Sequence, residues 1–411
     1  MAITASRHCA AASGWRARAI ASAAFGPAGA AERAHGPEGE VAQLPVVAGV
    51  DEEAGERAGE CPERDAGEHQ EREATADERQ VLAGWTSWGA VPQVFDERDD
   101  RFQSEREQLR ELLTHQEYNA ARRTILNAHY TSNDYVDPMW EAMLQMGFTG
   151  GQVLEPGCGS GQFLQAAPVG DSRLSDEIRL TGVELDPVTA LIAQQLNPQA
   201  RVRAESFADS PFADGTFDAV IGNVPFGKTA LHDPKHNADK HSLHNHFILK
   251  SLALTRPGGV VAVLTSRYTM DAQSDVARRA MFEQADLIGA VRLPTGAHRQ
   301  LAGTEVVTDL VMLRRRGPDE TPGDDSWVHT TTIDLTDRDG LNVPTVVNQW
   351  WEDHPEAVLG QMRLDHGMFN AHTLEVRSDG DANVDFSRAV MTAVHAGRET
   401  GLTWTPATSD E

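Results

Sequence analysis

Between Gly151 and Arg316, short apolar runs alternate with segments of helical periodicity, and this alternation limits the possible folds of the chain more than any other feature. Strands that are joined by crossover helices lie parallel in one sheet, with helices on both of its faces. We therefore predict an α/β fold with a seven-stranded, mostly parallel sheet. The strands are expected at Val153–Leu154, Leu180–Leu185, Ala200–Ala204, Phe217–Ile221, Val260–Thr265, Leu287–Leu293 and Asp309–Arg314.

The composition on either side of this segment predicts four regions. The first is rich in Ala, Gly, Glu and Arg, is poor in periodic apolar residues, and is expected to be disordered. The second is a helical segment that packs on the α/β domain, with helices at Ser104–Asn127 and Tyr135–Met146. The last is an acidic, partly ordered extension with an irregular tail and a small element near Val347–Met362. The four regions are 1–78, 79–148, 149–316 and 317–411.

The 411 residues carry a formal net charge of −26, and most of the acidic excess lies in 51–100 and after Pro318. This charge argues against a protein that binds nucleic acid over its whole surface, although the balanced segment between them can hold a local basic groove. The three cysteines have no paired spacing, so neither a disulfide framework nor a zinc cluster is expected. No apolar run approaches the roughly 18 residues of a membrane helix. We predict a cytoplasmic protein without a membrane partner.

A glycine-rich turn follows the first predicted strand, with the sequence Glu-Pro-Gly-Cys-Gly-Ser-Gly over Glu155–Gly161. Gly157, Gly159 and Gly161 let the backbone approach a ligand closely, and the helix after them offers free N–H groups. Such a turn also occurs in enzymes that bind dinucleotides. Glu155 favours S-adenosylmethionine (SAM), because its carboxylate can meet the cofactor's ammonium group through an ordered water.

The second predicted strand ends in two acidic residues, Glu184 and Asp186. A carboxylate at the carboxyl end of this strand can accept hydrogen bonds from both ribose hydroxyls of a bound nucleoside. The alternative is that these residues cap the following helix. For Glu184 we favour the ribose contact, and for Asp186 both interpretations stay open.

The fourth predicted strand is followed by Asn223, Val224, Pro225 and Phe226. These residue types suit a site that binds a planar amine. The side-chain oxygen of Asn223 and a neighbouring carbonyl can accept hydrogen bonds from an exocyclic amine, which turns its lone pair towards a methyl donor. Pro225 stiffens this arrangement, and Phe226 can stack on a flipped-out base. Taken alone, the pattern also fits an ordinary Asn-x-Pro turn.

At these residues the chain resembles the gamma-class N6-adenine DNA methyltransferases, which carry Asn-Pro-Pro-Phe or Asn-Pro-Pro-Tyr at this place. The resemblance implies a Rossmann-like, SAM-dependent methyltransferase fold and a contact from the Val224 carbonyl to the amine. It further implies that Tyr130 and Thr131 lie over the methionine part of SAM. The residues that it places at the adenine of SAM are Glu205, Ser206 and Phe207.

Over roughly residues 80–365 the chain also resembles the methylase portion of large plasmid- and phage-borne methylase–helicase fusion proteins. Shared segments include Arg256–Gly259 and Thr265–Asp271. The sequence has no Gly-x-x-x-x-Gly-Lys-Ser/Thr loop, so the helicase part is missing. The resemblance implies restriction-modification, with DNA as substrate and a separate helicase or specificity protein as a further partner.

Two alternatives remain at this stage. The same amine-binding motif serves methyltransferases that act on glutamine side chains or RNA, and a fragment that binds SAM or a partner without turnover would also fit. Five histidines between His232 and His246 suit a mobile loop near the substrate better than a metal site, so no metal is expected. Arg267 and Tyr268 end the fifth predicted strand and are expected to face the site.

Overall fold

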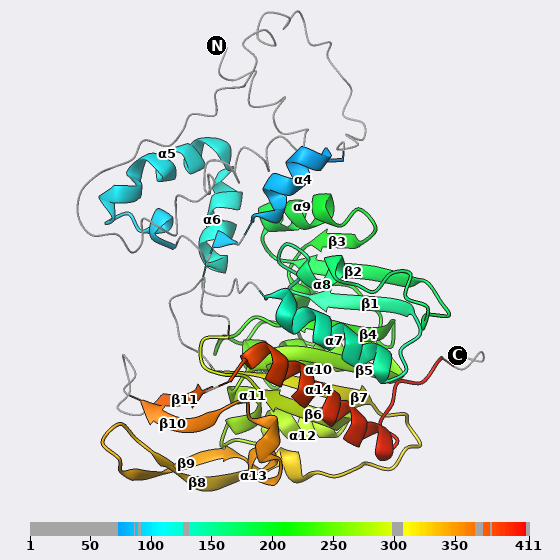
Figure 1. The fold of residues 1–411 in the computed structure, drawn as a ribbon. Coiled ribbons are helices and arrows are strands. Elements are labelled where there is room, and N and C mark those ends of the chain that lie inside the picture. The colour runs from blue at the N-terminus through cyan, green and yellow to red at the C-terminus, as the bar shows by residue number, and fades with distance from the viewer. Residues whose placement is uncertain are drawn as a thin grey trace, which may run out of the picture. The chain divides into compact units, whose positions relative to one another are not determined.

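The chain forms two compact units, which we describe separately (Figure 1). One comprises Met1–Trp85 and Gln93–Tyr118, and the other comprises Thr86–Pro92 and Asn119–Glu411. Nearly all of the region that is predicted to be disordered lies outside the described residues. The computed structural model describes residues 73–85, 87–88, 92–125, 131–297, 307–365, 373–378 and 380–407.

The prediction of one helix over Ser104–Asn127 is wrong, because a second helix begins after Thr114. The Oγ1 of Thr114 accepts a hydrogen bond from the backbone N–H of Glu117 at 3.3 Å, and the Glu117 carboxylate accepts one from the Thr114 N–H at 2.7 Å. This reciprocal pair is a capping box, which satisfies the first N–H groups of a helix. The elements before and after this break are α4 (Ala76–Ala83), η3 (Pro92–Phe95), η4 (Asp100–Phe102), α5 (Gln103–Leu112) and α6 (His115–Thr124).

Seven strands form one sheet in the order β3-β2-β1-β4-β5-β7-β6 (Figure 1). Neighbouring strands pair in parallel, except that β7 runs antiparallel to β5 and to β6. The predicted Rossmann-like, seven-stranded and mostly parallel sheet is therefore confirmed. The strands are β1 (Gly151–Pro156), β2 (Ile178–Glu184), β3 (Arg201–Ala204), β4 (Phe217–Asn223), β5 (Thr255–Ser266), β6 (Ala285–Arg292) and β7 (Thr308–Arg315).

Helices cover both faces of the sheet because its strands bury side chains on both sides. In β1, Val153 belongs to the apolar core on one face and Leu154 to the core on the other, as the twofold alternation of a strand requires. The predicted helices between the strands are present, and no helix in the described part of the chain is long and apolar enough to span a membrane. The predicted helices between strands are α8 (Gln162–Gln165), α9 (Pro187–Leu196), α10 (Leu243–Leu254) and α12 (Val276–Phe282), and α7 (Asn133–Gln145), also predicted, precedes β1. Two short elements between strands, η5 (Phe207–Asp209) and α11 (Tyr268–Asp271), were not predicted.

The extension after Pro318 was predicted to be only partly ordered, with an irregular tail and one small element. This prediction is wrong, because the extension contains more strands and helices. It forms two antiparallel hairpins, β8–β9 and β10–β11, and ends in a long helix, α14. Its elements are η6 (Ser326–Val328), β8 (Thr330–Thr336), β9 (Asn342–Asn348), α13 (Gln349–Asp353), η7 (Pro355–Ala357), β10 (Gln361–Asp365), β11 (Thr373–Arg377) and α14 (Ala382–Glu399).

Helix α14 packs on β6 and lies beside α7 (Figure 1). Its buried residues Phe386, Val390 and Val394 recur every four positions, and the Asp381 side chain caps its start. This spacing and cap are the sequence signals that predict such a helix. Gly397 lets the helix approach β6 closely, since a Cβ at this position would lie only 2.6 Å from Ile288 Cγ2.

We expect Phe386→Ala to lower the free energy of unfolding by about 3–5 kcal/mol, because the ring is fully buried and its removal leaves a cavity. The Phe386 ring meets the edge of Tyr135 at a centroid distance of 5.1 Å, which adds to this loss. Urea unfolding followed by circular dichroism measures the change. Val384→Ala, at a side chain that is 53% exposed on the same helix, is the control. Equal stability of the two variants would contradict the packing role of α14.

Candidate functional site

Two loops meet at the carboxyl edge of the sheet, where β1 pairs with β4. One is the glycine turn, Gly157–Gly161, and the other is the target motif, Asn223–Phe226. A Cβ at Gly157 would lie 3.4 Å from Cδ of Pro225, so the two loops are in contact. The structure thus brings together the two sequence motifs on which the predicted chemistry depends.

The glycine turn needs glycine for its backbone conformation and for space. Gly157, Gly159 and Gly161 have φ angles of +70°, +54° and +83°, which residues with a Cβ rarely adopt. A Cβ at Gly161 would collide with the Asn197 side chain, whereas one at Gly159 would meet no described atom within 4 Å. The space beside Gly159 is therefore open to a ligand.

Glu184 lies at the end of β2, directly beside the glycine turn. Its carboxylate accepts hydrogen bonds from the backbone N–H groups of Gly159 at 3.0 Å and Asp186 at 2.8 Å. Burial raises the pKa of Glu184 to about 7, and the neighbouring negative charge of Asp186 adds to this shift. By exposed area the residue is half-buried.

Asp186 has a different role from Glu184. Its Oδ2 accepts hydrogen bonds from the backbone and side chain of Thr189 at 2.9 and 2.7 Å, as an N-cap does, and from Trp88 Nε1 at 3.0 Å. The carboxylate is buried, so the structure favours the capping interpretation. Leu185, which the sequence interpretation missed, lies between the two acids and is 50% exposed. The sequence offers only its position at the end of a strand as a signal, because exposure cannot be read from a sequence.

Asn223 holds the acceptor that the target motif requires. Its Nδ2 donates to Thr131 Oγ1 at 3.1 Å, while its Oδ1 is buried and has no hydrogen-bond partner among the described residues. Leaving a buried acceptor unpaired costs about 1–3 kcal/mol, so this oxygen is suited to a donor from a ligand. Tyr130, predicted beside Thr131, lies outside the described residues.

The rest of the target motif is anchored on both sides. The N–H of Val224 donates to the carbonyl of Leu264 at 3.0 Å, which extends the pairing of β4 with β5 by one residue. A proline at this position has no N–H for that bond, which gives a physical reason for valine here. The Val224 side chain is fully buried, whereas Pro225 and Phe226 are half-buried.

The remaining predicted cofactor residues have partners within the protein. Glu155 is buried beneath α8 and accepts a hydrogen bond from the Leu164 N–H at 3.3 Å, and burial raises the pKa of its carboxyl well above the usual range. Glu205 pairs with Arg203 at 2.6 Å, and Ser206 precedes η5. The Phe207 ring is buried against Phe247 at a centroid distance of 4.8 Å, so this ring packs in the core.

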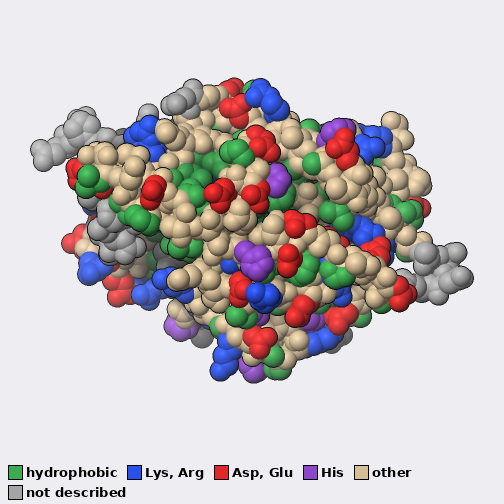
Figure 2. All heavy atoms as spheres, turned by 90° about the horizontal axis from the view of Figure 1, so that it is seen from below, with side chains coloured by type: hydrophobic (Ala, Val, Ile, Leu, Met, Phe, Trp, Pro, Cys, Tyr) green, Lys and Arg blue, Asp and Glu red, His purple; other side chains and the backbone are tan. Residues whose placement is uncertain are grey.

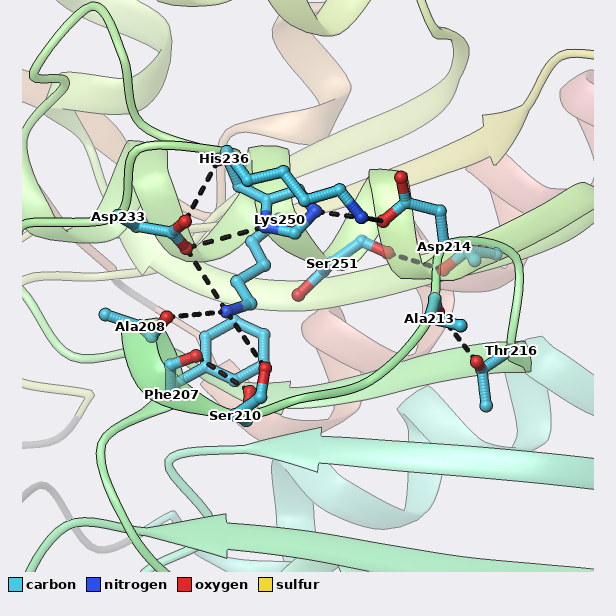
Figure 3. A network of polar contacts seen from close by, with 12 residues as sticks. Phe207, Ala208, Ser210, Ala213, Asp214, Thr216, Asp233, His236, Lys250 and Ser251 are labelled. Carbon is cyan, nitrogen blue, oxygen red and sulfur yellow. Dashed lines mark hydrogen bonds and ion pairs between the residues drawn. The ribbon is translucent and has the colours of Figure 1, made fainter.

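A buried polar network links η5 to the loop after the target motif (Figure 3). Lys250 is 1% exposed, and its Nζ donates to the Ala208 carbonyl at 2.9 Å and to Asp233 at 3.2 Å. His246 Nε2 lies 3.1 Å from the same Asp233 oxygen. Although burial raises the pKa of Asp233, hydrogen bonds from His236, His246 and Lys250 hold it well below its usual range.

This network also accounts for part of the histidine cluster. His236 and His246 both contact the Asp233 carboxylate, and among the described residues they do not form a metal-ligand set with further side chains. Within the residues that the structure describes, no group of three His, Cys, Asp or Glu side chains could hold a metal ion. From the sequence, Lys250 is expected either to contact a phosphate or to be solvated, and its burial against Asp233 corrects both interpretations. A buried charge pair has no periodic signature by which the sequence could have shown it.

Part of the chain is similar to a family of restriction-modification methylases. The family model described as "Eco57I restriction-modification methylase" matches residues 170–296, which run from the β1–β2 connection to just beyond β6. The predicted resemblance to DNA methyltransferases is confirmed for this part of the chain. The Defense against restriction protein B of Escherichia phage P1 is 27% identical over 318 residues. The alignment covers 74% of this chain but only 12% of that protein.

Two solved structures match parts of the chain with low overall similarity. The modification subunit of a putative type I restriction enzyme from Vibrio vulnificus YJ016 is 20% identical, with a TM-score of 0.39, over 52% of this chain and 50% of that one. The methyltransferase subunit of a type I restriction-modification system from Streptococcus thermophilus is 16% identical, with a TM-score of 0.40, over 56% and 60%.

The raised pKa of Glu184 predicts a pH-dependent stability. In the folded protein the Glu184 carboxyl keeps its proton up to about pH 7. In the unfolded chain, where its pKa is 4.5, it loses the proton at a lower pH. The resulting stabilisation is complete below the unfolded pKa and is lost as the pH rises through the folded one. Relative to wild type, Glu184→Gln is therefore expected to be more stable at about pH 8 than at about pH 5. Thermal unfolding at both pH values measures this, with the exposed Glu352→Gln as control. A pH-independent difference would contradict it.

Lys250→Met is expected to destabilise the protein by about 3–5 kcal/mol, because it leaves the Asp233 carboxylate and the Ala208 carbonyl without their cation. Urea unfolding gives the value. The control is Lys235→Met, since Lys235 pairs with Asp214 but is 60% exposed, and its loss is expected to cost less than about 1 kcal/mol. Equal free energies of unfolding for the two lysine variants would show that the buried network does not make this contribution to stability.

Proposed function

We propose that this chain transfers a methyl group from SAM to the exocyclic N6 amine of adenine in DNA. The observation that carries the proposal is the buried, unpaired Oδ1 of Asn223, which lies in a motif that contacts the glycine turn. An acceptor without a donor is the group that a flipped-out amine would satisfy. The match of residues 170–296 to a restriction-modification methylase family supports DNA as the substrate.

The residues present fit SAM, which when bound supplies an electrophilic methyl group. The open space beside Gly159 admits the cofactor backbone, and Glu184 would accept hydrogen bonds from the ribose hydroxyls. Leu185 offers an apolar surface for the adenine ring, next to the segment Glu205–Phe207. Thr131, with Tyr130 before it, and Glu155 would lie towards the methionine part. Asp186 is better assigned to the cap of α9.

The chain's own residues would act by position rather than by covalent chemistry. Asn223 Oδ1 and the Val224 carbonyl would accept the two N–H groups of the target amine, which draws its lone pair out of conjugation with the ring. Thr131 holds the Asn223 amide in place, and Phe226 would stack on the base. Alignment of the amine and exclusion of water would then lower the barrier without a metal.

The DNA contact is expected to be local, given the acidic charge of the chain. On the face shown in Figure 2, Lys and Arg side chains lie among Asp and Glu side chains and do not form one basic patch. The alignment spans about 12% of the length of the phage relative. We propose that a separate helicase or specificity protein assists this chain, and that the reaction occurs in the cytoplasm.

Transfer of labelled methyl from SAM into unmodified duplex DNA tests the proposal. Wild type is expected to form N6-methyladenine, identified by mass spectrometry of the nucleosides. Asn223→Ala is expected to lower the rate by about 100-fold or more, because it removes the acceptor that aligns the amine. Asn342→Ala, at an exposed asparagine in β9, is the control.

RNA and glutamine-containing protein are tried in parallel. Label in either of these, and not in DNA, would overturn the DNA assignment in favour of an RNA or glutamine methyltransferase. SAM binding without transfer to any acceptor would indicate a non-catalytic fragment.

A further inference from the structure

Tyr268 is an exposed aromatic side chain at the active edge of the sheet. Seven large apolar side chains among the described residues are exposed, and Tyr268, at 48%, is the one aromatic side chain of that group. It is the first residue of α11, directly after the carboxyl end of β5. An aromatic ring combines a large apolar face with a polar tip, which makes an exposed tyrosine at this edge a candidate contact for a planar ligand.

Tyr268 follows the strand that lies next to the one carrying the target motif. Strand β5 pairs in parallel with β4, and Leu264 is opposite Asn223 in the register. Tyr268 follows four residues after Leu264, and Pro225 and Phe226 continue outwards from β4 in the same direction. Both strands therefore deliver their next residues to the same edge, with Tyr268 on the β5 side of the proposed base pocket.

The ring is held by its neighbour Arg267. The Arg267 guanidinium carbon lies 4.4 Å from the ring centroid, and its Nη2 donates to the tyrosine oxygen at 3.3 Å. The same guanidinium reaches the Asp271 carboxylate at 3.3 Å. Arg267 thus ties the exposed ring to a group that is 1% exposed at its side chain, which reduces the freedom of the ring before any ligand arrives.

Asp271 is itself fixed in a buried ionic cluster. It receives Arg292 Nη2 at 2.8 Å and Trp351 Nε1 at 3.1 Å, and Arg292 also forms two hydrogen bonds with Asp309. Side chains of this cluster are at most 1% exposed. An exposed ring that is anchored to such a cluster loses little conformational entropy when it binds a ligand, which favours binding.

We propose that Tyr268 stacks on a nucleobase of the DNA beside the flipped adenine, while Arg267 holds the ring in place. This inference rests on the proposed function. The chemistry matches a strand of nucleic acid, because an aromatic face binds a base of any sequence. It assigns a DNA contact to a chain whose net charge is strongly negative.

Equilibrium binding of a fluorescent, unmethylated duplex of mixed sequence tests the stacking. Tyr268→Ala and Tyr268→Leu are expected to weaken DNA binding about tenfold, whereas Tyr268→Phe keeps the affinity close to wild type. The salt dependence of binding is expected to stay unchanged, because no charge is removed. Affinity for SAM is also expected to stay unchanged, which shows that the variants are folded. Leu341→Ala, at another exposed apolar residue, is the control.

Photocrosslinking to duplex DNA that contains 5-iodouracil gives a second, independent readout. We expect an adduct on Tyr268, located by mass spectrometry of the peptides. The inference is overturned if Tyr268→Ala binds DNA like wild type, as it would if the ring served a protein partner, or if Tyr268→Phe loses as much affinity as Tyr268→Ala. In either case wild-type methylation of DNA would leave the proposed function standing. Wild type that neither binds nor methylates DNA would overturn the proposed function itself.

Discussion

The close contact between Gly157 and Pro225 is the constraint on which the site depends. A Cβ at position 157 would lie 3.4 Å from Pro225 Cδ, an ordinary contact distance, so the glycine turn and the target motif, which follow strands β1 and β4, lie directly against each other. Glycine is needed at this position for its φ angle of +70°, which residues with a Cβ rarely adopt. Because these strands are neighbours and parallel, their loops share one edge and meet without any long connection. The open space at Gly159, the Glu184 carboxylate and the unpaired Asn223 oxygen are then presented around one point.

Buried charges hold the elements around this point in place. Lys250 ties η5 to the loop after the target motif, and the cluster around Arg292 ties the β5 end to α13. Each cation is removed from water, so each must be paired within the protein. Such pairs favour one arrangement of the loops over others that would leave a buried charge alone.

The sheet and the principal site residues could be predicted because they follow local rules. Apolar alternation gives the strands, and glycines and an Asn-x-Pro pattern after strands mark the edge where ligands bind. Asp186 could not be assigned in this way, since a helix cap and a ligand contact have the same local sequence. Its partner Trp88, 98 residues away, supports the cap. The regular spacing of the apolar residues in α14 was present in the sequence, but the region was interpreted as irregular because it is acidic.

The segment after α14 has a consequence for how the chain acquires its structure. Trp404 Nε1 donates to the Asp218 carbonyl at the start of β4, Arg314 Nε donates to the Thr403 carbonyl, and Thr405 N–H donates to Gly258. Contacts that span 186 residues form late in folding, because the chain between them must be ordered first. All three bonds lie at the edge of the sheet where β4 begins, opposite the edge that carries the glycine turn and the target motif. The segment after α14 thus completes the central strands from the side of the sheet that is remote from the site.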